Sequence, residues 1–297
     1  MSIVSFVKYI ASWAQNAGAI PADTVVATHD RASDGASVQD VYLDNLRDFF
    51  TEVSEGNITG YSLVHKFGAS ASIGTTLLPV ALANTYQTPT TATSLEFVSD
   101  SANDTANGTG ARQITVIGIG ADWTEVSQTV TTNGITAVAL TTPLLRLYRW
   151  YVSQSGAYAT QATSSHVGKL TIRVAGGGTT WSQIPVTPFP MGQSQIGSYT
   201  VPLGKTAYLL SLDVYVSSSK AVDVLVFQRP NANDITAPYT GAIRLVSQWA
   251  QVTGHLPVKY RSPRGPFVGP CDIGFMAKTS TGTGSATVEF ELILENS

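Results

Sequence analysis

The sequence predicts a mainly β protein with two antiparallel, jelly-roll-like β-sandwich domains behind a short helical N-terminal segment. Three observations lead to this fold class. After about residue 70 the spacing of apolar residues changes from the helical period of about 3.6 to the strand period of 2. Charged residues make up only 12% of the chain, and Ser, Thr, Asn, Gln and Gly supply a polar surface that suits β proteins. A Pro-rich stretch then divides the β region in two.

Residues 1–70 contain two stretches with helical spacing. The stretch 2–16 has apolar side chains three and four positions apart, and the stretch 37–55 begins at the capping residue Ser37 and ends at Gly56. Helices this short with large apolar faces are unstable alone in water. Packing within the chain, docking onto a neighbouring subunit and binding at a membrane surface all remain open for the first face. As the working prediction we assign partner docking to Ile3, Phe6, Val7, Ile10, Trp13, Val41, Phe49 and Phe50.

Residues 71–184 and 193–297 carry the strand pattern, and each range is predicted to form one β-sandwich. Apolar and polar side chains alternate most clearly at 208–217 and 287–294, as strands with one buried face require. The segment 185–192 contains three prolines, which cannot donate into a strand ladder, so we assign it as the linker.

Composition and motifs argue against catalysis and against several kinds of ligand. The formal net charge of −3 disfavours a general nucleic-acid binder. The four histidines are widely separated and the single Cys271 cannot build a thiolate zinc site, so we predict no metal ion and no cofactor. No apolar run approaches the roughly 18–20 residues that span a membrane. We predict that the protein is not an enzyme.

Two clusters leave a functional alternative open. The loop Asp100–Asp104 has oxygen ligands at short spacing but lacks the acidic ladder of a calcium loop, so a plain polar loop is favoured. With Asp122 and Glu125, the same aspartates can supply the paired carboxylates of glycoside hydrolysis, although each also suits a turn. The basic stretch 255–264 can contact phosphate or an acidic partner, and a solvated, proline-stiffened loop is the simpler interpretation.

Two blocks of the sequence resemble a family of virion structural proteins of tailed bacteriophages. They are DSANDTANGTGARQITVIGIGADWTEVSQTVTTNG, at residues 100–134, and SYTVPLGKTAYL, at residues 198–209. The resemblance covers about residues 73–297 and contains no catalytic signature. It implies a virion component, assembled in the host cytoplasm with capsid, portal, neck or tail proteins. We therefore expect a structural protein that docks through its N-terminal segment onto the head, neck or collar.

The alternative is a tail-associated receptor-binding protein or adhesin whose sandwich binds host glycans, a role that the same fold supports. In either case we expect a homo-oligomer, with a trimer as the first assumption, because self-association is the commonest way to cover a surface with few charges. The strand at 144–152 is apolar on both faces. The predicted contact between copies therefore consists of Leu145, Arg146, Tyr148, Arg149 and Trp150.

Overall fold

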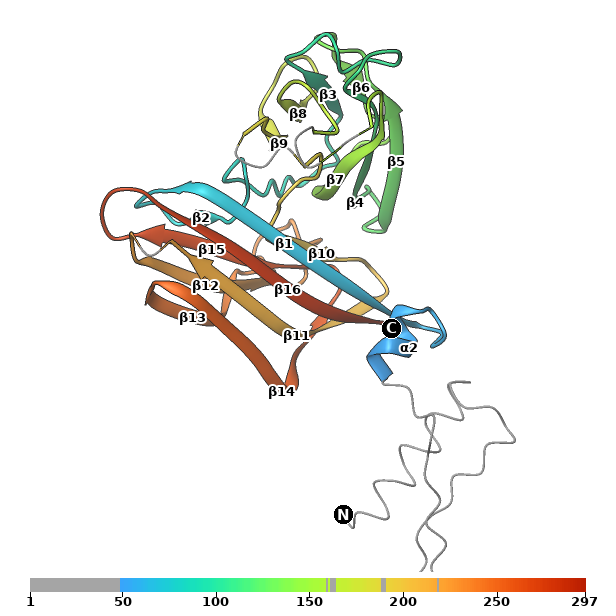
Figure 1. The fold of residues 1–297 in the computed structure, drawn as a ribbon. Helices are drawn as coiled ribbons and strands as arrows, with labels where there is room; N and C mark the ends of the chain where they lie inside the picture. The colour runs from blue at the N-terminus through green and yellow to red at the C-terminus, as the bar shows by residue number, and fades with distance from the viewer. Residues whose placement is uncertain (1–48, 159, 161–163, 188–190, 218) are drawn as a thin grey trace, which may run out of the picture. The chain divides into compact units, whose positions relative to one another are not determined.

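The computed structural model describes residues 49–158, 160, 164–187, 191–217 and 219–297 (Figure 1). These residues form two compact units, one of 49–64 with 293–296 and one of 65–292 with 297. Strands dominate, and all the strand pairings whose register is described are antiparallel. The prediction of a mainly β, antiparallel protein is therefore confirmed.

The helix α2 (Phe49–Ser54) lies within the predicted helical stretch 37–55. It ends where the sequence indicates, because Gly56 adopts a φ of 78°, a left-handed conformation that favours glycine. The amide of Gly56 donates to the carbonyl of Val53 at 3.1 Å, which closes the last turn. The predicted helix at 2–16 and the first part of the second helix lie outside the described residues.

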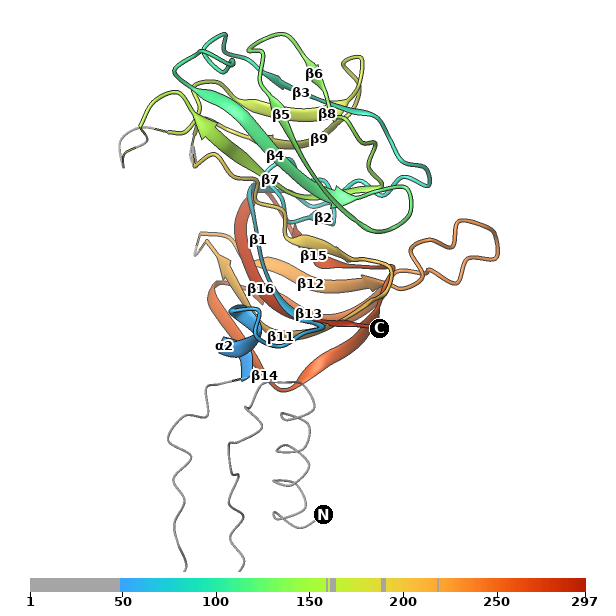
Figure 2. The ribbon, with the colours of Figure 1, turned by 90° about the vertical axis from the view of Figure 1, so that its right-hand side faces the viewer.

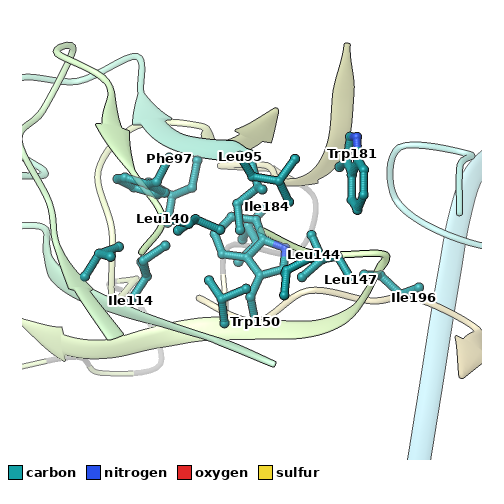
Figure 3. Packing of buried hydrophobic residues seen from close by; sticks show 14 of the residues in the cluster. Leu95, Phe97, Ile114, Leu140, Leu144, Leu147, Trp150, Trp181, Ile184 and Ile196 are labelled. Carbon is teal, nitrogen blue, oxygen red and sulfur yellow. The ribbon is translucent and has the colours of Figure 1, made fainter. Parts of the chain in front are cut away.

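Two facing sheets are built by residues 95–184, and we call them the insert sheets. One has the order β6-β3-β8-β9 and the other β5-β4-β7. Side chains from both sheets form one core, in which the rings of Trp150 and Phe97 meet edge to face with centroids 6.3 Å apart (Figure 3). The strands are β3 (Leu95–Ser99), β4 (Ala111–Ile119), β5 (Glu125–Thr131), β6 (Val138–Ala139), β7 (Arg146–Ser155), β8 (Leu170–Val174) and β9 (Thr180–Ile184).

Two further sheets, the frame sheets, are built by strands from both sides of this insert in the sequence. Their orders are β1-β16-β11-β14 and β10-β15-β12-β13, with β2 paired to β15. Phe275 and Phe290, one from each sheet, are buried with ring centroids 5.4 Å apart. The strands are β1 (Tyr61–Ile73), β2 (Leu78–Pro79), β10 (Ser198–Val201), β11 (Lys205–Val216), β12 (Val222–Arg229), β13 (Arg244–Val252), β14 (Gly254–Val268), β15 (Cys271–Thr279) and β16 (Gly284–Asn296).

The alternation read from the sequence describes β16 well and β11 only in part. In β16 the residues Ala286, Val288, Phe290 and Leu292 are buried and those between them face outward, as predicted. In β11 we expected Leu210 on the buried face, and this prediction is wrong because Leu209 is buried in its place. The pairing of β11 with β14 shifts register on both sides of Leu209, and such a bulge moves the following side chains to the opposite face.

The predicted domain limits of 71–184 and 193–297 remain a prediction. Strand pairing puts β2, which lies inside the first range, beside β15, which lies inside the second. Of the predicted linker 185–192, the described part includes Gly192, whose carbonyl accepts from the amide of Val152 at 2.7 Å. The chain thus runs along the insert strand β7 before it enters β10.

Candidate functional site

A buried ion pair joins the insert to the frame. Arg146, at the start of β7, donates from Nε and Nη2 to the two carboxylate oxygens of Asp272 on β15, at 2.9 and 3.0 Å. Both side chains are 1% exposed. Thr200 on β10 donates to the same carboxylate at 2.5 Å, and the guanidinium carbon lies 5.1 Å from the ring centroid of Trp123. Arg146 also donates to two main-chain carbonyls, so this network is closed within the chain.

A second group of polar side chains lies between the insert and the frame. Lys66 on β1 is 3% exposed and donates from Nζ to the main-chain carbonyl of Tyr148 on β7. The hydroxyl of Tyr148 donates to the carboxylate of Glu125, and its ring meets that of Tyr199 edge to face, with centroids 4.8 Å apart. Glu125 is itself exposed, and we call Lys66, Tyr148 and Tyr199, together with the Arg146–Asp272 network, the buried junction.

Burial shifts the pKa of several groups at the junction. It lowers the pKa of Lys66 well below its ordinary value, with a further contribution from the charge of Arg149. It raises the pKa of Tyr148 and of Tyr199, so both phenols stay protonated. Perturbed pKa values mark many active sites but also occur in structural networks. Here the perturbed groups are covered by the chain, which offers a substrate no approach, and we assign the junction a structural role.

The thiol of Cys271, next to Asp272 of the ion pair, is also expected to be unreactive. The thiol is fully buried, and burial together with the charge of Asp272 raises its pKa to about 12. Since the thiolate is the reactive form, a pKa this high keeps the side chain from acting as a nucleophile near neutral pH.

Replacing Lys66 with Met should weaken the pH dependence of stability. An unfolded chain holds the Lys proton up to a pKa of about 10.4, whereas folded Lys66 loses it at lower pH. Between the two pKa values the unfolded state binds more protons, so the free energy of unfolding of the unaltered protein rises with pH across that window. Met keeps the apolar stem and removes the titration. At about pH 7 the variant should lose no more than about 1 kcal/mol, the worth of one hydrogen bond.

Urea unfolding between about pH 7 and pH 9 measures this difference in slope, below the range in which tyrosines titrate. Exposed Lys169 provides the matched control, and Lys169→Met should keep the slope of the unaltered protein. An unchanged slope in Lys66→Met would show that Lys66 is not desolvated.

Most of the residues predicted to contact another copy are covered by the chain itself. Leu145, Arg146, Tyr148 and Trp150 are between 0% and 3% exposed. The strand is apolar on both faces because each face is covered by a different part of the same chain. Trp150 lies in the insert core, where its indole donates to Ser182 at 2.8 Å. Arg146 and Tyr148 face the buried junction. These four residues therefore offer no surface to a second copy. Arg149 is half-buried and donates to the main-chain carbonyl of His65.

The predicted docking residues fall largely outside the described part of the chain. Phe49 and Phe50 are described: their ring centroids are 5.4 Å apart, and Phe49 also lies 5.8 Å from the ring of Tyr61. Phe50 is 39% exposed. The other six, Ile3, Phe6, Val7, Ile10, Trp13 and Val41, lie outside the described residues, so docking stays a prediction.

The structure places the two clusters that the sequence singled out, the carboxylates of residues 100–125 and the basic stretch 255–264. Asp104 is fully buried, and its carboxylate accepts hydrogen bonds from groups of the same chain. A buried Asp104 therefore cannot serve as one carboxylate of a pair that faces a cleft. The carboxylate of Asp122 accepts from the amide of Thr124 in its own turn. The carboxylate of Glu125 accepts from the hydroxyl of Tyr148. The basic stretch 255–264 forms part of the edge strand β14, which pairs with β11, and is not a loop. Its side chains alternate between half-buried and exposed as far as Arg261.

In the part of the chain that the structure describes, no group of three or more His, Cys, Asp or Glu side chains could hold a metal ion. No helix among the described residues is long and apolar enough to cross a membrane.

Comparison with known proteins leaves the family open. No protein-family model and no curated protein matches the chain. Similar solved structures include the T13 particle of infectious bursal disease virus, with 11% identity over 80% of this chain and 73% of that one and a TM-score of 0.18. The VP2 subviral particle of the same virus gives 11% identity, 80% and 77% coverage and a TM-score of 0.18. TM-scores this low do not establish a common fold, and the resemblance to tailed-phage virion proteins remains a prediction.

Proposed function

We propose that the protein is a structural component of a bacteriophage virion that docks through its N-terminal segment onto the head, neck or collar. The strand order of the frame sheets carries this proposal. Numbered along the chain from β1 through β10 to β16, the eight main frame strands form sheets of order 1-8-3-6 and 2-7-4-5. This is the order of an eight-stranded jelly roll, an architecture that viral capsid and lectin domains share. The sequence resemblance to phage virion proteins favours the former use.

The insert supports the same proposal. It enters the chain between the first and second strands of the jelly roll, and the buried junction fixes it there through Arg146–Asp272 and Lys66–Tyr148. Buried ion pairs hold two parts in one arrangement because breaking them leaves an uncompensated charge. A frame that carries a fixed second β module fits a protein whose task is to present a surface on a particle, assembled with other virion proteins.

Replacing Phe6 and Trp13 together with Ser is expected to abolish incorporation into particles. Both residues belong to the apolar face of the segment 2–16, and burying two large aromatic side chains supplies several kcal/mol of docking free energy. The β region should stay folded, since these residues lie outside it. Purified virions assembled with the altered protein would be probed for its presence by immunoblot.

The matched control replaces Ile135 and Tyr158 with Ser, because both are exposed apolar residues of the insert, Ile135 between β5 and β6 and Tyr158 after β7 (Figure 2). This control should still incorporate. Normal incorporation of the Phe6/Trp13 variant would place the docking surface elsewhere on the protein.

We also propose that the protein is a homo-oligomer, with a trimer as the first expectation. Since the strand 144–152 is covered, the contact must use other surface. The stretch 235–245 provides several apolar side chains with large exposure, at Ile235 (44%), Tyr239 (62%), Ile243 (66%) and Leu245 (57%). Exposed apolar residues gathered in this way mark interaction sites.

A further inference from the structure

The outer face of the frame sheet β1-β16-β11-β14 contains a hollow with an unusual set of side chains. Because β16 alternates, Thr287 and Glu289 face outward while Val288 and Phe290 enter the core. The hollow has a volume of about 490 Å³ and is lined by Asp213, Tyr215, His255, Thr287, Val288 and Glu289. Three neighbouring strands, β16, β11 and β14, therefore contribute to one surface depression.

The carboxylates of this hollow are held in place by histidines from the two edge strands. Nε2 of His255 lies 2.9 Å from Oδ1 of Asp213, and Nε2 of His65 lies 2.6 Å from Oε1 of Glu289. All four side chains remain between 46% and 55% exposed. Each carboxylate is thus oriented through one oxygen, and at this exposure the other oxygen is free to accept a hydrogen bond from a hydroxyl group.

Tyr215 gives the hollow an apolar surface. Tyr215 is 60% exposed because it stands on the outward face of β11, whereas its neighbours Val214 and Val216 face inward and are fully buried. An exposed aromatic ring beside fixed hydrogen-bond acceptors matches a ligand that has both a C–H face and hydroxyl groups. A pyranose ring has this combination.

The charges of the hollow narrow the ligand class. Two carboxylates, Asp213 and Glu289, disfavour phosphate, sulfate and acidic sugars by like-charge repulsion. Among the described residues, these lining side chains do not form a group that could hold a metal ion. The hydroxyl groups of an uncharged sugar can donate hydrogen bonds to both carboxylates, and its ring can stack on the ring of Tyr215.

We propose that this hollow binds a neutral, hydroxyl-rich glycan. Tyr215 supplies the stacking surface, and Asp213 and Glu289 accept from sugar hydroxyls. The inference goes beyond the structural role and does not depend on N-terminal docking. A virion protein with such a site contacts a glycan of the host surface while its frame is held in the particle.

The test uses the full chain and the methyl glycosides of glucose, galactose, mannose and N-acetylglucosamine as probes, with saturation-transfer NMR and titration of the protein amide signals. We expect at least one glycoside to bind. Tyr215→Ala and Asp213→Asn should each weaken its affinity about tenfold or more, the size of one aromatic or charge-assisted contact. Tyr158→Ala removes a tyrosine that is 93% exposed and lies outside the hollow, and it should leave affinity unchanged.

The proposal is overturned if none of the four glycosides binds, if both hollow variants bind as well as the unaltered protein, or if Tyr158→Ala weakens binding equally. Preferential binding of sialyl or sulfated sugars would also refute the neutral class. Incorporation into virions is measured separately, so failure here and failure of N-terminal docking are distinguishable. Because Tyr215 is exposed, a melting temperature equal to that of the unaltered protein should confirm that its variant is folded.

Discussion

Replacing Asp272 with Asn is expected to lower the free energy of unfolding by about 3–5 kcal/mol, because the guanidinium of Arg146 is left buried without its counter-charge. Both side chains of the pair are 1% exposed, so water cannot take the place of the lost carboxylate. The remaining acceptors of Arg146 are main-chain carbonyls, which carry no full charge. The loss should be seen in urea or thermal unfolding at neutral pH.

Replacing both partners should cost much less than replacing one. In Arg146→Met with Asp272→Leu, no unpaired charge remains and the apolar side chains fill similar space, a change that is often neutral or stabilising. The comparison pair is Arg173–Glu96, where Arg173 is 31% exposed and Glu96 also accepts from the amides of Gly176 and Gly177. Arg173→Met should therefore cost about 1 kcal/mol or less. If Asp272→Asn costs no more than Arg173→Met, the ion pair is not what fixes the insert to the frame.

The spacing of apolar residues predicted the mainly β fold class because this spacing depends only on which side of each strand is buried, a property of the strand itself. Alternation in β16 follows from which side of one strand is buried, and the sequence contains that information directly. Which strand pairs with which is a non-local property, and β1 and β16 stand at opposite ends of the described chain. The order of the frame strands and the position of the insert between β2 and β10 therefore could not be read from spacing. The bulge at Leu209 likewise depends on the partner strand β14.

The candidate sites show the same limit. The sequence shows that the strand at 144–152 is apolar on both faces, but it does not show that the frame of the same chain covers Arg146 and Tyr148. The partner of Arg146 could not be predicted, because Asp272 lies far along the sequence and follows Cys271 without any motif. The hollow was missed for a similar reason, since Asp213, His255 and Glu289 meet only when three strands align.

Asp104 lies in the loop that follows β3, where the sequence offered a choice between a calcium loop and a plain polar loop. Its side chain is fully buried. The carboxylate accepts hydrogen bonds from Oγ of Ser99 at 2.6 Å and from the amides of Ala111, Val167 and Gly168 at 2.8, 2.9 and 2.8 Å. One side chain thus connects the end of β3, the start of β4 and the loop before β8. With its oxygens filled by donors, the carboxylate cannot also coordinate a cation.

Replacing Asp104 with Ala is therefore expected to lower the free energy of unfolding by about 4 kcal/mol or more, since each buried donor left without an acceptor costs about 1–3 kcal/mol. Asp104→Asn keeps one acceptor oxygen and turns an amide toward the other donors, so it should lose an intermediate amount. Asp100 is exposed and accepts from the amide of Lys169 at 2.6 Å, so Asp100→Ala is the matched control and should cost about 1 kcal/mol.

Urea unfolding followed by tryptophan fluorescence measures all three variants. Adding calcium or a chelator should leave the transition of the unaltered protein in place, because the hydrogen bonds to Asp104 and not a metal ion hold these loops together. A midpoint that rises with calcium concentration and falls with a chelator would instead mean that a bound ion holds them, since a ligand that binds only the folded state stabilises it by mass action.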